Sequence, residues 1–214
     1  PYKAGVYHDF TWRGWYDFGT GALGDMACHT VNMPFWGLEL GYPIRFWRED
    51  SGERKPETFP LWSVLKYEFP ERKSKKTGET LPPVTMTWYD GDDAHMHQPP
   101  KELFPDGNVP RTGSLLIGDK GTMVSPGDSG TEYVLFPQDK YKDYEPPTPW
   151  IARSPGHMRE FVDAVKGGPP AASNFEYSGF LSEVVLAGCL SLHTDKKIEW
   201  DGPNMIAKNA PELA

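Results

Sequence analysis

The sequence has few of the features that mark proteins of membranes, nucleic acids or metal centres. Only two cysteines, Cys28 and Cys189, occur in 214 residues, and their spacing matches neither a redox motif nor a metal-ligand motif. No run of 18 apolar residues is present, so we expect no membrane-spanning segment. The net charge is −8, which argues against a nucleic-acid partner because phosphates require a basic surface. These absences leave a globular protein and do not identify its cellular location.

What is present favours one compact domain over residues 1–214. Hydrophobic residues make up 38% of the chain and aromatic residues 14%, enough apolar side chain for a packed interior at this length. The 22 prolines and 22 glycines indicate long loops rather than disorder, because aromatic residues are spread along the chain. The basic cluster at 71–76 lies between two strand-like runs, so it predicts a solvated hairpin loop rather than a binding site.

A loop rich in aromatic residues near the start of the chain is the first candidate for a binding surface. Large aromatic side chains and arginine on a loop usually contact a ligand or another protein. Glycines at positions 19, 21 and 24 follow and allow close backbone approach where a helix is expected to begin. The candidate substrate-binding residues here are His8, Trp12, Arg13, Trp15 and Tyr16.

A helix predicted over 21–37, which Pro34 is expected to kink or restart, gathers polar groups on one face. Asp25 and His29 are four residues apart and therefore share a helical face, to which Asn32 and Trp36 are added one and two turns later. A carboxylate beside an imidazole can move a proton to or from a hydroxyl group. The pattern predicts a pocket for a small hydroxylated molecule, with Asp25 and His29 as catalytic residues and Asn32 as a binding residue. The opposite face is expected in the core and carries Ala27, Val31 and Phe35.

The rest of the chain alternates between strand-like and helical patterns. Strands are predicted at 42–49, 62–69, 82–89, 113–118, 121–125, 131–136 and 196–200, with a turn at 89–93 and a long excursion over 92–112. Helices are predicted from Pro155, with Ser154 as N-cap, and over 176–194. The first of these two helices has an apolar stripe that we expect to be buried: Met158, Phe161, Val162 and Val165. This order indicates an α+β fold, an open and mostly antiparallel sheet with helices on one face.

Histidine and cysteine suggest two further chemistries. His95 and His97 could point to one side of a strand as metal ligands, but their neighbours favour a loop and no third ligand is indicated, so no metal site is predicted. Cys28 precedes His29, and adjacent helical residues point about 100° apart, so a nucleophilic pair is not expected. Both cysteines are predicted to be small buried helix residues.

Several segments together resemble one family. Residues 21–29, Gly-Ala-Leu-Gly-Asp-Met-Ala-Cys-His, resemble the Asp-x-x-x-His signature in the C-terminal domain of the Gfo/Idh/MocA oxidoreductases, which include glucose–fructose oxidoreductase and inositol dehydrogenase. Later segments resemble that domain's strand–turn–strand, penultimate helix, closing helix and last strand in the same order: 113–122, 157–165, 182–188 and 197–201. The resemblance covers nearly all of the chain.

The resemblance implies a sugar or polyol dehydrogenase that uses NAD or NADP, held mainly by an N-terminal Rossmann domain. By position, His29 would hydrogen-bond the hydroxyl that becomes a carbonyl, and Asp25 would hold or charge-balance it. The family's lysine in a Glu-Lys-Pro motif has no counterpart, since residues 54–56 read Arg-Lys-Pro, and Asn32 stands where the family often has Asp. The family also commonly oligomerises through its sheet, which implies a homo-oligomer through the open sheet face.

No Gly-x-Gly-x-x-Gly loop follows a strand in the sequence. We therefore expect residues 1–214 to be a fragment without its Rossmann domain, inactive in hydride transfer by itself. Two alternatives stay open. One is a redox-neutral NAD-dependent glycosidase or eliminase of the same fold, with Tyr16 as a further general acid. The other is a stand-alone carbohydrate-binding module, in which Asp25 and His29 anchor hydroxyl groups.

Overall fold

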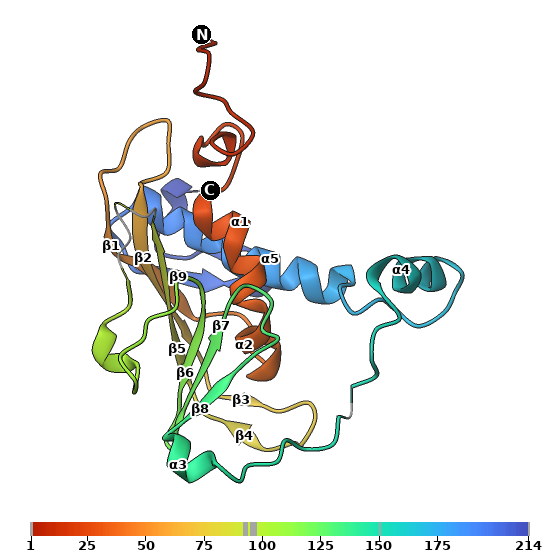
Figure 1. Cartoon of the computed structure of the whole chain (residues 1–214). Coiled ribbons are helices and arrows are strands. Elements are labelled where there is room, and N and C mark those ends of the chain that lie inside the picture. Colours follow the sequence, from red (N-terminus) through yellow and green to blue (C-terminus); the bar gives the residue numbers. More distant parts are fainter. Residues whose placement is uncertain (1, 92–93, 95–97, 150, 214) are drawn as a thin grey trace.

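A five-stranded sheet forms the centre of the computed structural model (Figure 1), which describes residues 2–91, 94, 98–149 and 151–213. Its spatial order is β10–β9–β1–β2–β5, and every neighbouring pair is antiparallel. These strands are, in that order, Ile206–Ala207, Ile198–Asp201, Arg45–Ser51, Trp62–Phe69 and Val84–Gly91. The prediction of an α+β fold with an open, antiparallel sheet is confirmed.

Smaller elements surround this sheet. A three-stranded antiparallel sheet has the order β6–β7–β8, and β3 and β4 form a short ribbon. The strands are β3 (Arg72–Lys73), β4 (Thr80–Leu81), β6 (Gly113–Ile117), β7 (Thr122–Pro126) and β8 (Val134–Phe136). The helices are α1 (Gly21–Thr30), α2 (Asn32–Gly37), α3 (Gln138–Tyr141), α4 (His157–Val165) and α5 (Phe175–Leu190). Single 3-10 turns are η1 (Trp12–Gly14), η2 (Lys101–Leu103), η3 (Ser191–His193), η4 (Gly202–Asn204) and η5 (Pro211–Leu213).

The main core lies between one face of the five-stranded sheet and helices α1 and α5. Period-two alternation along β2 directs Leu65, Tyr67 and Phe69 to this face, and each is at most 1% exposed. A Cβ atom on Gly188 of α5 would lie 1.7 Å from the Tyr67 hydroxyl oxygen, so this glycine lets α5 approach the sheet closely. The predicted core face of the first helix is confirmed, with Ala27, Val31 and Phe35 all buried.

Pro34 divides the predicted first helix into α1 and α2, as expected. Proline has no N–H group for the carbonyl of Thr30, four residues before it. The Ser114 hydroxyl, on β6, donates to that carbonyl at 2.6 Å. The break in the helix therefore creates the acceptor that ties the smaller sheet to the helical layer.

The basic cluster at 71–76 belongs to the β3–β4 hairpin, as predicted, but the hairpin is attached to the end of α2. The Arg72 guanidinium donates to the Leu38 carbonyl, with 2.8 Å from its Nε. The Glu39 carboxylate accepts from the Ser74 hydroxyl at 2.7 Å, and this bond holds the pKa of Glu39 below its ordinary value. Arg72 and Glu39 therefore anchor the hairpin to the end of α2.

Helix α4 is the main departure from the sequence prediction. Its apolar stripe is exposed, not buried, with Met158 79%, Phe161 64% and Val165 71% accessible. The helix stands at the edge of the molecule beyond the N-terminal end of α5 (Figure 1). Periodicity identifies an amphipathic helix but carries no information about what covers its apolar face. The prediction that this stripe, which also includes Val162, lies in the core is therefore wrong.

The start of α4 also differs from the prediction. The helix begins at His157, after Gly156 with a φ of 107°, rather than at Pro155. The Ser154 hydroxyl accepts a hydrogen bond from the Gly156 N–H at 3.0 Å. Ser154 thus stabilises the turn before the helix and does not cap it.

Two other local predictions need correction. Cys28 is exposed and Cys189 only partly buried. Strand β5 extends to Gly91 and so includes the first three residues of the turn predicted at 89–93; residues 92 and 93 lie outside the described residues. The Asp90 carboxylate accepts from the Ser63 N–H at 2.6 Å and from the Ser63 hydroxyl at 2.9 Å, and burial raises the pKa of Asp90. The proposed histidine pair at 95 and 97 lies outside the described residues.

Segment Phe175–His193, which contains α5 and η3, is long and apolar enough to cross a membrane by length and composition. Its buried residues Leu181, Val184 and Val185 pack in the main core. A single helix of this kind is weak support for a membrane span, because core helices have the same composition.

Replacing Ser114 with alanine should destabilise the fold by about 1 kcal/mol, because the Thr30 carbonyl loses its donor. The same substitution in a Pro34→Ala background should cost less, since residue 34 then has an N–H group of its own for Thr30. Urea unfolding of the four proteins measures this coupling. Equal costs in the two backgrounds would contradict the proposed link.

Phe161→Ser should change the free energy of unfolding by less than about 0.5 kcal/mol, because the ring is largely exposed. Leu181→Ala, in the core, should cost about 2–5 kcal/mol. Urea unfolding compares them, and a large loss for Phe161→Ser would show that α4 packs on the domain.

Candidate functional site

The segment that precedes α1, residues 2–20, is here called the aromatic loop, and it is hydrogen-bonded to the connection between β1 and β2. Trp15 forms an isolated antiparallel bridge with Thr58, and the Phe59 N–H donates to the Gly14 carbonyl at 2.9 Å. Gly19 allows the loop to fold onto itself, since a Cβ there would lie 2.5 Å from the Arg13 Cα. The fold of the loop thus places the Arg13 side chain next to α1.

Arg13 is the ion-pair partner of Asp25. Its Nη1 lies 3.2 Å from the Asp25 Oδ2, and the two side chains are 27% and 36% exposed. The guanidinium carbon also lies 4.4 Å from the Phe10 ring centroid and 5.9 Å from that of Trp12. The structure therefore brings together three predicted site residues, Trp12, Arg13 and Asp25, through charge and cation–π contact.

His29 is exposed one turn further along α1. In the described part of the chain, its imidazole makes no hydrogen bond or ion pair, and the carboxylate of Asp25 is turned to Arg13 instead. The predicted shared helical face holds, but no hydrogen bond or ion pair joins the Asp25 and His29 side chains among the described residues. The imidazole nitrogens are consequently open to a ligand.

Asn32 and Trp36 contact α5. The Tyr177 hydroxyl donates to the Asn32 Oδ1 at 2.5 Å, and the Trp36 and Tyr177 ring centroids are 5.8 Å apart. Burial raises the pKa of Tyr177 to about 12, so its hydroxyl stays protonated and remains a donor. Asn32 therefore joins α2 to α5, which the helical period alone did not indicate.

Tyr16 packs between two rings, with centroids 4.4 Å from Phe59 and 4.7 Å from His193. Burial raises the pKa of its hydroxyl, and nearby Arg54 opposes this shift. Tyr16 thus connects the aromatic loop to the segments around β1 and η3.

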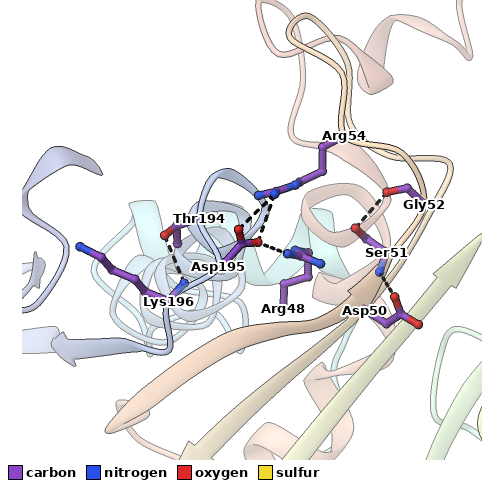
Figure 2. A network of polar contacts seen from close by, with 8 residues as sticks. All are labelled: Arg48, Asp50, Ser51, Gly52, Arg54, Thr194, Asp195 and Lys196. Carbon is purple, nitrogen blue, oxygen red and sulfur yellow. Dashed lines mark hydrogen bonds and ion pairs between the residues drawn. The ribbon is translucent and has the colours of Figure 1, made fainter.

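Arg54 and Arg48 belong to a polar network at those segments (Figure 2). Both guanidinium groups bind the Asp195 carboxylate, with 3.1 Å between the Arg54 Nη2 and the Asp195 Oδ1. The Lys196 N–H donates to the Thr194 hydroxyl at 3.2 Å. This network fixes the turn after η3 to β1 and to the loop that supports Tyr16.

Beside the ion pair, the aromatic loop forms an open hollow with a volume of about 730 Å³. It is lined by Tyr2, Tyr7, Trp12, Asp17 and Phe18. Of these residues, only Trp12 was predicted. Tyr2, Tyr7 and Phe18 could have been identified by the same aromatic signal, whereas Asp17 carries no such signal. His8 is exposed, and its Nδ1 accepts from the Phe10 N–H at 3.3 Å, so it shapes the loop.

A metal ion and a dinucleotide each require a particular arrangement of residues. The described residues contain no group of three His, Cys, Asp or Glu side chains placed to hold a metal ion. Their strand pairs are antiparallel, whereas a dinucleotide-binding unit needs parallel strands with a glycine-rich turn. The strand pairs of the described residues therefore do not form a dinucleotide-binding unit of this kind.

Neither protein-family models nor curated proteins match this chain.

Arg13→Ala should destabilise the domain by about 1 kcal/mol, because it removes both the Asp25 ion pair and the contact with Phe10. Arg159→Ala is the matched control. It removes an exposed pair with Asp163 at 2.8 Å and should cost about 0.3–0.5 kcal/mol. Denaturant unfolding distinguishes them, and equal effects would contradict a structural role for the Arg13 contacts.

Proposed function

We propose that this domain is the substrate-binding half of an NAD(P)-dependent oxidoreductase that acts on a sugar or polyol hydroxyl. The observation that carries the proposal is the arrangement on α1: Asp25 held by Arg13, and an exposed imidazole on His29 one turn away. The fold and the segments that resemble the Gfo/Idh/MocA family support the same function.

Oxidation of a hydroxyl requires a base for its proton, and a neutral imidazole is suited to this near neutral pH. His29 would accept that proton. Arg13 would keep the Asp25 carboxylate in place, and its guanidinium has further N–H groups for substrate oxygens. Because the described strand pairs are all antiparallel, a Rossmann unit that holds NAD or NADP would belong to another part of the polypeptide.

The redox-neutral alternative receives less support. It would use a further general acid, for which Tyr16 is the candidate, and burial raises the pKa of the Tyr16 hydroxyl. A higher pKa makes Tyr16 a weaker proton donor. The raised pKa therefore counts against Tyr16 as the further acid, while Asp25 and His29 serve both readings equally.

A homo-oligomer through the open sheet face stays a prediction. That face carries ion pairs between neighbouring strands, with 3.0 Å between the Lys66 Nζ and the Glu49 Oε1. The Lys197 Nζ lies 4.0 Å from the Trp47 ring centroid. A second copy would therefore meet a surface that includes these paired charges.

His29→Ala, in the polypeptide that includes the nucleotide-binding part, should lower turnover of its sugar substrate by about 100-fold or more, as expected for loss of a general base. The fold should survive because His29 is exposed. His157→Ala is the matched control, since His157 is exposed on α4, and should have ordinary turnover. Nicotinamide absorbance measures the rates, and near-normal activity of His29→Ala would overturn the assignment.

A further inference from the structure

The hollow in the aromatic loop has the composition of a site for positive charge. Four of its five lining residues are aromatic and the fifth is Asp17. Among the residues that the structure describes, neither a lysine nor an arginine lines it. We propose that this hollow binds an organic cation, such as an alkylated ammonium group, independently of the oxidoreductase function proposed above.

The rings provide walls in different orientations. The Tyr7 and Phe18 rings are 5.8 Å apart at 86°, and Trp15 supports Tyr7 from 5.1 Å. Tyr2 lies 6.4 Å from Tyr7. The faces of aromatic rings carry negative potential and attract cations, and cages of such rings recognise quaternary ammonium groups.

Asp17 adds a full negative charge at the same place. Throughout the part of the chain that the structure describes, its carboxylate has neither a hydrogen-bond nor an ion-pair partner. Asp17 is thus not used to hold the loop together, unlike Asp25, which is paired with Arg13. The net charge of −8 also favours cationic over anionic ligands.

The same loop already binds one cation within the chain. The Arg13 guanidinium lies over Phe10 and near Trp12, and its charge is balanced by Asp25. A neutral sugar would gain from ring stacking and from hydrogen bonds of its hydroxyl groups to Asp17. A cation adds direct attraction to the ring faces and to the Asp17 charge, so the lining favours a cation.

Tetramethylammonium and tert-butanol, which have similar shape but different charge, test this directly. Both are titrated in one tube with this chain, and their methyl proton resonances are followed by NMR. We expect the tetramethylammonium line to move upfield through ring currents and to saturate in the millimolar range, while the tert-butanol line stays in place. Equal shifts of both probes, or no shift of tetramethylammonium, would overturn the proposal.

Two variants locate the site. Asp17→Asn and Phe18→Leu should each weaken tetramethylammonium binding by about 2- to 5-fold, in line with one exposed cation–π or charge contact. Asp9→Asn makes the same charge change in the same exposed segment, outside the lining, and should leave binding unchanged. Equal effects of Asp17→Asn and Asp9→Asn would overturn the site, as would binding of methyl glucoside in place of tetramethylammonium.

Discussion

Close backbone contact between the aromatic loop and the start of α1 is the constraint on which the candidate site depends. At Gly19 a side chain would collide with the Arg13 backbone, its Cβ lying 2.5 Å from the Arg13 Cα. At Gly21, φ is +67° and a Cβ would lie 2.8 Å from the Phe59 ring. Only glycine satisfies both conditions without strain. These two residues bring Arg13 within ion-pair distance of Asp25.

The same contact connects the site to the rest of the fold. Tyr16 packs at a tilt against Phe59 and against His193 of η3, and the network around Asp195 fixes the turn after η3 to β1 (Figure 2). On the other side, α1 packs with α5 on the sheet. Movement of α1 would therefore disturb the core. A fixed helix of this kind is suited to side chains that hold a substrate in one position.

Sequence reasoning succeeded where a local pattern is sufficient. Alternation placed β2 at 62–69, and proline marked the break before α2. It failed where the partner is distant in the chain. The spacing of Asp25 and His29 shows that they share a helical face, but the contact of Asp25 with Arg13 depends on the loop's bonds to residues 57–59. The stripe of α4 likewise predicts an amphipathic helix, and its exposure follows from its position beyond α5.

The most direct measurement follows the imidazole proton resonances of this chain while myo-inositol or glucose is added. His29 and His157 are both exposed on helices, so His157 serves as the internal reference. A substrate site on α1 predicts that the His29 resonance shifts and saturates while that of His157 stays constant. If neither resonance moves, or if both move alike, the outward face of α1 is not the place where a sugar or polyol binds.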